Sequence, residues 1–123
     1  MYKISVTTKF ASAHRLRGYE GPCENLHGHN WVVTAIVGID ELDEIGIAYD
    51  FKKLKNHLNE IIERLDHQFL NEVSPFDKIN PTSENIAKFI FESLAGKLDS
   101  GARVISVEVG ESEKYKAVYE ESC

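Results

Sequence analysis

The fold of this chain is decided first by residues 2–10, YKISVTTKF, in which apolar or β-forming side chains alternate with polar ones. Successive side chains of a strand point to opposite faces of a sheet, so this period of two predicts a strand with one buried face. A second run rich in β-formers, WVVTAIV at residues 31–37, predicts another strand within residues 29–39. Residues 15–28, with their glycines and Pro22, are typical of a loop.

The period changes after Tyr49, and two amphipathic helices are predicted. Apolar residues spaced three and four apart form one stripe on a first helix of about four turns. Thr82 is the expected N-cap of a second helix, Glu84 lies in its first turn, and Gly101 is the expected stop. The stripes consist of Phe51, Leu54, Leu58, Ile61, Ile62 and Leu65 in the first helix, and of Ile86, Phe89, Ile90, Leu94 and Leu98 in the second.

Alternation returns in residues 103–109, and a short strand is predicted at residues 114–120. The element order is then β-β-α-α-β-β. This order predicts an α+β fold, in which a four-stranded antiparallel sheet carries two helices on one face. A length of 123 residues fits a single domain spanning residues 1–123.

Composition and charge limit the partners and the location that we expect for this chain. The formal net charge of -6 does not favour a nucleic-acid partner, although Lys9, Arg15 and Arg17 form a local basic cluster that suits an anionic ligand. At least one of the three is expected to contact such an anion, with solvated loop charges as the competing interpretation. No apolar run approaches the ~20 residues needed to span a membrane. The first residues are typical of a strand and not of a secretory signal, so the expected location is the cytoplasm.

Three histidines are the candidate metal ligands. His27 and His29 are two apart on a predicted strand, so their side chains point the same way. His14 continues the even-numbered, buried face of the first strand. If both faces look inward, the three imidazoles meet, and three histidines with an open fourth position are typical of catalytic zinc. His57 lies between apolar positions of the first helix and is expected at the surface, while Gly28 is expected to let the backbone bend or be approached closely.

Cys23 lies four residues before His27 and has three competing roles: a fourth zinc ligand, an inert thiol, or a thiolate base beside the metal. The first role would make the site structural, and the sequence alone leaves the first and third open. A disulfide with Cys123 is not expected in a reducing compartment. Asp66 and His67 follow the first helix, where the histidine suits either a helix-end cation or a general acid/base, and the residues alone favour the first.

Five motifs occur together in this chain. In order they are FASAHRL at 10–16, CENLHGH at 23–29, YDF at 49–51, LDHQFLN at 65–71 and NPTSEN at 80–85. On these motifs the chain resembles the 6-pyruvoyl-tetrahydropterin synthase family. Within it, the chain is most similar to the bacterial 6-carboxytetrahydropterin synthases of queuosine biosynthesis.

The resemblance implies the tunnelling fold, in which sheets of neighbouring subunits join into a barrel. Two barrels stack as a homo-hexamer with active sites between subunits. It implies that Zn²⁺ is held by His14, His27 and His29. The substrate implied is a small pterin triphosphate, 7,8-dihydroneopterin triphosphate, with no nucleic-acid or membrane partner.

The resemblance also implies roles for further residues. Cys23 is the catalytic thiol, and Asp66 and His67 assist proton transfer. Glu111, with Glu108 as the alternative, anchors the pterin ring. Thr82 and Ser83 are expected to contact the substrate. The implied product is 6-carboxy-5,6,7,8-tetrahydropterin, with acetaldehyde and triphosphate released. The alternatives are a 6-pyruvoyl product from the same site and, from another class, a non-catalytic structural zinc module.

Overall fold

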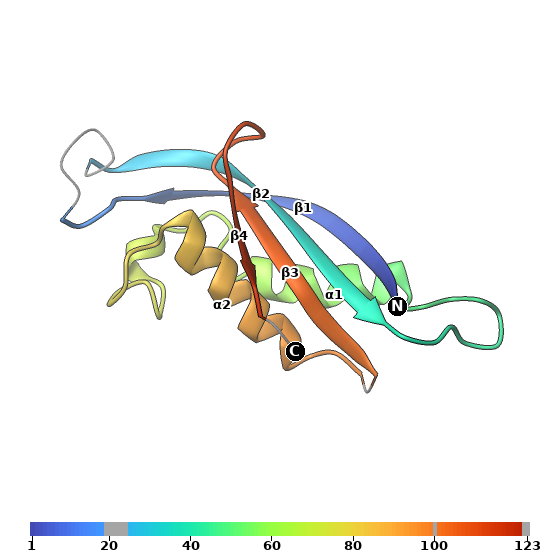
Figure 1. Cartoon of the computed structure of the whole chain (residues 1–123). Helices are drawn as coiled ribbons and strands as arrows, with labels where there is room; N and C mark the ends of the chain where they lie inside the picture. Colours follow the sequence, from blue (N-terminus) through green and yellow to red (C-terminus); the bar gives the residue numbers. More distant parts are fainter. Residues whose placement is uncertain (19–24, 100, 122–123) are drawn as a thin grey trace.

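The computed structural model of this chain describes residues 1–18, 25–99 and 101–121 (Figure 1). The predicted order β-β-α-α-β-β is confirmed, with one added 3-10 turn, η2, before the second helix. The elements are β1 (Tyr2–His14), β2 (His27–Ile39), α1 (Phe51–Ile62), η2 (Leu70–Glu72), α2 (Ser83–Ala95), β3 (Ala102–Gly110) and β4 (Lys116–Glu120).

The four strands form one antiparallel sheet in the order β1-β2-β3-β4, and both helices lie on the same face of it (Figure 1). Helix α1 packs on β1, and α2 packs on β3 and β4. The predicted α+β class is therefore confirmed. The core between sheet and helices contains Trp31, Val33 and Val107 from the strands and Leu58 and Ile90 from the helices, all fully buried.

Strands β1 and β2 form a long hairpin arm that extends beyond the rest of the sheet. They pair along their whole length, from Tyr2 opposite Ile39 to His14 opposite His27. The pairing of β2 with β3 begins only at Val32 opposite Gly110, so residues 27–31 of β2 have no β3 neighbour. The end of the arm therefore offers backbone and side chains for a site beside the sheet edge.

Each helix begins directly after a residue whose side chain caps it. The side chain of Asp50 accepts a hydrogen bond from the Lys52 amide at the start of α1. Thr82 does the same for the Asn85 amide at the start of α2, so the predicted N-cap is confirmed. Each bond satisfies one amide that the first helical turn leaves without a partner.

The helix ends differ from the sequence prediction. Helix α2 ends at Ala95 with Gly96 as C-cap, and Leu98 packs against the core from the following loop. Gly101 is not the helix stop; its positive φ of 88° instead allows the turn into β3. Helix α1 ends at Ile62, so it is about one turn shorter than predicted. Phe51, expected in its buried stripe, is 60% exposed.

The connection between the two helices runs along the outer edge of β1. Backbone bonds join His67 to the carbonyl of Ala11 at 2.6 Å and Ala13 to the carbonyl of Gln68 at 3.0 Å. This contact brings residues 65–85 against the end of the hairpin arm. In the part of the chain that the structure describes, no helix has the length and apolar character needed to cross a membrane.

Candidate metal centre

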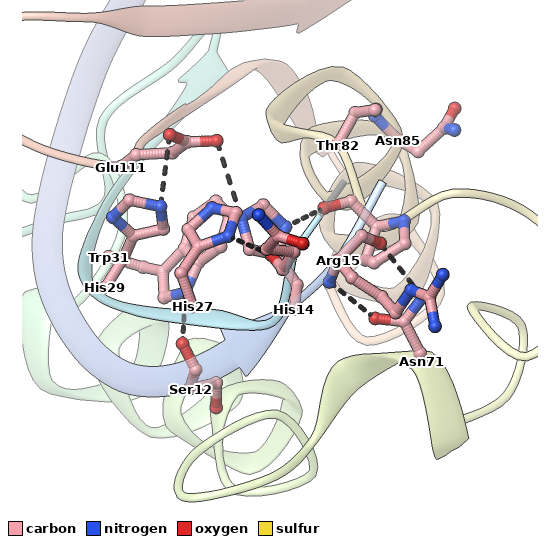
Figure 2. Close-up of polar contacts among 12 residues, drawn as sticks. Ser12, His14, Arg15, His27, His29, Trp31, Asn71, Thr82, Asn85 and Glu111 are labelled. Carbon is pink, nitrogen blue, oxygen red and sulfur yellow. Dashed lines mark hydrogen bonds and ion pairs between the residues drawn. The ribbon is translucent and has the colours of Figure 1, made fainter. Parts of the chain in front are cut away.

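His14, His27 and His29 converge at the end of the hairpin arm (Figure 2). Each offers one ring nitrogen, and these atoms all lie within 4.8 Å of one another. The strand register explains the arrangement, because His14 is directly opposite His27 and Ser12 is directly opposite His29. All three side chains therefore share the helix-facing side of the sheet, as the sequence parity predicted.

Main-chain carbonyls fix which ring nitrogen of two histidines carries the proton. Nδ1 of His14 lies 2.8 Å from the carbonyl oxygen of Pro81, and Nδ1 of His27 lies 2.6 Å from that of Asn25. A carbonyl oxygen only accepts, so each Nδ1 donates and each Nε2 of a neutral ring presents its lone pair. The two Nε2 atoms are 3.0 Å apart. Lone pairs facing each other at that distance repel unless a cation neutralises them.

His29 supplies the third nitrogen. Its Nε2 is buried and forms no hydrogen bond with the described residues, although Oε2 of Glu111 lies 3.3 Å away. That distance qualifies as an ion-pair contact but lacks hydrogen-bond geometry. An unsatisfied buried nitrogen aimed at two other imidazoles fits a metal ligand set. Burial lowers the pKa of His14 and of His29, which favours the neutral form that binds a metal.

The aromatic ring of Trp31 packs against two of the imidazoles. The ring of Trp31 is fully buried and lies 4.8 Å from that of His14 and 5.4 Å from that of His29, both edge-on. Its indole N–H donates to the Ser12 carbonyl at 3.1 Å, and its ring stacks on that of Phe10, with the centroids 5.8 Å apart. The close packing of Trp31 and Phe10 limits the movement of the histidine side chains.

Glu111 lies over the histidine cluster. Its carboxylate oxygens are 3.7 Å from Nε2 of His14 and 3.3 Å from Nε2 of His29. It follows Gly110, where an added Cβ would meet the carbonyl oxygens of Ser112 and Tyr115 at 2.6 Å, so this turn requires glycine. Glu108 is paired with Thr34 on the opposite face of the sheet from Val33 and Val109, and so faces away from the histidines.

Asp66 and His67 form an exposed pair at the outer edge of β1. Nδ1 of His67 lies 3.0 Å from Oδ2 of Asp66, while Oδ1 of Asp66 accepts the Ala11 amide at 2.9 Å. His67 adopts a positive φ of 55°, which is uncommon for a residue with a side chain. It lies in the turns after α1, outside the helix, and its main-chain amide is bonded to β1.

Other predicted site residues have structural roles or lie outside the described residues. Thr82 caps α2, and Ser83 is the first residue of that helix. Cys23 and Cys123 are outside the residues that the structure describes, and so the roles proposed for Cys23 stay open. At Gly28 a Cβ would meet nothing within 4 Å among the described atoms, so the expected close approach does not occur there.

The family model for 6-pyruvoyl tetrahydropterin synthase matches residues 3–122. The chain belongs to the 6-pyruvoyl tetrahydropterin synthase family. It is an enzyme of the tetrahydropterin synthases, and three of its histidines are placed to hold a metal ion.

Individual relatives with tetrahydropterin synthase names are similar to this chain over most of its length. A putative 6-carboxy-5,6,7,8-tetrahydropterin synthase of Archaeoglobus fulgidus is 38% identical over 110 residues, covering 89% of this chain and 88% of the relative. The 6-carboxy-5,6,7,8-tetrahydropterin synthase of Aquifex aeolicus is 29% identical over an alignment of 159 positions, covering 98% of both chains. The solved 6-pyruvoyl tetrahydropterin synthase of Caenorhabditis elegans superposes with a TM-score of 0.84 at 29% identity, covering 98% of this chain and 96% of that one.

The three residues of the predicted basic cluster have different surroundings in this synthase. The guanidinium of Arg17 donates to the carbonyls of Phe76 and Ile79, both at 2.9 Å, and so ties two loops together. Lys9 lines a cavity of about 370 Å³ together with His29 and Glu111. Arg15 is exposed. Lys9 of the predicted basic cluster therefore shares a cavity with the candidate metal centre.

Sequence reasoning missed the supporting contacts of the synthase site. Asn71 and Asn80 bond to the main chain of Arg15 and Arg17, and the Pro81 carbonyl accepts from His14. The only signal for them was their place in the motifs LDHQFLN and NPTSEN. Hydrogen bonds across 56 to 67 residues have no local sequence pattern.

Proposed function

We propose that this chain is a zinc-dependent 6-carboxy-5,6,7,8-tetrahydropterin synthase of queuosine biosynthesis. It would convert 7,8-dihydroneopterin triphosphate to 6-carboxy-5,6,7,8-tetrahydropterin, releasing acetaldehyde and triphosphate. The observation that carries the proposal is the convergence of three imidazoles beneath Glu111 in a chain of this family. The names of the Archaeoglobus and Aquifex relatives support this product.

The histidines suit a catalytic metal. His14, His27 and His29 would hold Zn²⁺ through three nitrogens, which leaves a position for a substrate oxygen. The bound ion would act as a Lewis acid on the side-chain hydroxyls of the substrate and acidify the neighbouring carbon positions. An open fourth position would distinguish this arrangement from a structural zinc site, whose four ligands all come from protein.

Residues of the chain would bind the pterin and move the protons. Glu111 would accept hydrogen bonds from ring N–H groups of the pterin, because its carboxylate lies beside the metal ligands and is 33% exposed. Cys23 as a thiolate would remove or return a proton on the substrate side chain. His67, oriented by Asp66 at 3.0 Å, would act as the paired acid. Thr82 and Ser83 remain proposed substrate contacts at the start of α2.

A homo-hexamer with active sites between subunits is part of the proposal. Within residues 1–18, 25–99 and 101–121, the structure has no hydrogen bond to the outer backbone edge of β1 between Lys3 and Lys9. Strand β4 is the other edge of the sheet. Free edges are usually paired or covered, and pairing between subunits would close the sheets into a barrel. A monomer in sedimentation at micromolar concentration would contradict this assembly. The cytoplasmic location expected from the sequence stays a prediction.

The runner-up is a 6-pyruvoyl-tetrahydropterin synthase with the same substrate and site. The similarity to the Caenorhabditis structure favours it. Incubation with 7,8-dihydroneopterin triphosphate, followed by the product mass and an acetaldehyde assay, separates the two. Stoichiometric acetaldehyde with a carboxy product supports the proposal; a pyruvoyl product without acetaldehyde supports the runner-up. Absence of any turnover with zinc bound would favour a structural zinc module.

A further inference from the structure

From Ala11 onward, the outer edge of β1 forms hydrogen bonds. Every second residue from Ala11 to Arg17 is bonded through its main chain to the connection between the helices. Asp66 binds the amide of Ala11, and the Gln68 carbonyl binds that of Ala13 at 3.0 Å. The series then continues past the end of β1, where β2 no longer provides a partner because β1–β2 pairing ends at His14.

Two asparagine side chains hold this continuation. Oδ1 of Asn71 accepts the Arg15 amide at 2.9 Å, and its Nδ2 donates to the Arg15 carbonyl at 3.0 Å (Figure 2). Asn80 makes the same pair of bonds with Arg17, at 2.9 and 2.8 Å. Each side-chain amide thus replaces the main-chain donor and acceptor of a neighbouring strand. Asn71 is 9% exposed, so its amide has little access to water as an alternative partner.

The same turn also orients a metal ligand. Pro81, the neighbour of Asn80, provides the carbonyl that receives Nδ1 of His14. Asn85 donates to the Asn80 carbonyl at 2.9 Å, and Thr82 caps the helix that follows. The chain on both sides of the His14–Pro81 contact is therefore fixed: Asn71 and Asn80 hold the residues after His14, and Asn80 is itself part of the Pro81 turn.

We propose that Asn71 and Asn80 are positioning residues of the metal centre, which hold His14 with its Nε2 directed at His27 and His29. The inference rests on the proposed metal centre. Its physical basis is that the described residues after His14 have no strand partner, so their order depends on side-chain bonds. Four of these bonds come from Asn71 and Asn80, and two more come from the Arg17 guanidinium. Loss of either pair lets the end of β1 fray and separates His14 from the Pro81 carbonyl. The Pro81 carbonyl is the direct partner of the His14 ring, and such partners of a metal ligand are worth roughly 10- to 100-fold in metal affinity.

The test measures zinc affinity in the full-length protein by competition with a chromophoric chelator. The variants are Asn71→Ala and Asn80→Ala, with Val104→Ala as control. Val104 is buried on β3 and is part neither of the histidine cluster nor of the asparagine contacts. We expect the zinc dissociation constant to rise about 10- to 100-fold in both asparagine variants and to stay within about twofold in the control, at a comparable loss of Tm. The Co²⁺ absorption spectrum should change in the same two variants.

Conservative variants keep the test decisive if an alanine variant fails to fold. Asn71→Asp and Asn80→Asp keep the acceptor for the main-chain amide but lose the donor to the carbonyl. They should weaken zinc binding less than alanine does, yet measurably. Unchanged zinc affinity and Co²⁺ spectrum in every folded variant would overturn the inference and leave the asparagines as stability contacts. Failure of the wild-type protein to bind zinc would instead refute the proposed function.

Discussion

Nδ1 of His14 lies 2.8 Å from the carbonyl oxygen of Pro81, a residue 67 positions later in the chain. This one bond connects the end of the first strand to the turn before the second helix. It also fixes the imidazole so that Nε2 faces His27 at 3.0 Å. The affinity of the site for a metal therefore depends on the packing of the helix connection against β1, as well as on the hairpin that carries the ligands.

Replacing any one of His14, His27 and His29 by alanine should sharply lower the zinc content. Each change removes one of three protein ligands and hence a large part of the binding free energy. His57→Ala is the matched control, because His57 lies on α1, outside the cluster. Metal analysis after dialysis is the measurement. Full occupancy in any two of the three cluster variants would refute the ligand assignment.

Lys9 and Arg17 should respond differently to neutralisation. Lys9→Gln should raise the KM for 7,8-dihydroneopterin triphosphate at low salt, because Lys9 lines the cavity beside His29. The effect should shrink at high salt, where the Debye length falls to ~3 Å at 1 M. Arg17→Gln should leave KM unchanged and lower the free energy of unfolding by roughly 1–2 kcal/mol, because two carbonyls lose their donor. The reverse pattern in steady-state kinetics and denaturant unfolding would mean that Arg17 binds the phosphates.

Thr82→Ala distinguishes a helix cap from a substrate contact. The variant should lose about 1 kcal/mol of unfolding free energy, because the Asn85 amide loses its acceptor. Thr82→Ser keeps the hydroxyl and should recover most of that loss. If Thr82 also contacts the substrate, the alanine variant will show a raised KM that serine restores. A stability unchanged by alanine in urea unfolding would contradict the cap.

Asp66 should make stability depend on pH in the acid range. The Ala11 amide, with a smaller contribution from the ring of His67 and against partial burial, holds the pKa of the Asp66 carboxyl below its ordinary value of 3.8. The folded state therefore binds fewer protons than the unfolded state near that pH. The stabilisation is complete above pH 3.8 and is lost as the pH falls through the lowered pKa. Asp66→Asn should be less stable than wild type at neutral pH, and the difference should shrink below pH 3.8; a constant difference would contradict the Ala11 contact.

The sequence predicted the parts of the fold that have a local period. Alternation predicted the strands, and parity predicted that His14 shares a face of the sheet with His27 and His29, as the register confirms. The predicted end of the second helix was wrong because Leu98 was assigned to the apolar stripe of the helix. It packs on the core from a loop, and Gly96 already ends the helix.

The hydrogen bonds that support the histidine site follow no local period in the sequence. The bonds from Asn71 and Asn80 reach residues 56 and 63 positions away, so no window of sequence contains both partners. Arg17 was expected either to contact an anion or to be a solvated loop charge. Its carbonyl partners, Phe76 and Ile79, are equally far away in the sequence and could not be predicted. Glu111 was placed by resemblance to the family. Its position over the imidazoles depends on the turn at Gly110, which only the folded chain displays.

X-ray absorption at the zinc edge of the full-length protein identifies the atoms that bind the metal. We expect one zinc per chain, bound by three imidazole nitrogens at ~2.0–2.1 Å and one oxygen, with no sulfur in the coordination shell. The oxygen should be exchangeable when substrate is added. A sulfur ligand at ~2.3 Å would place Cys23 on the metal and make the site structural, and fewer than three imidazoles would contradict the centre formed by His14, His27 and His29.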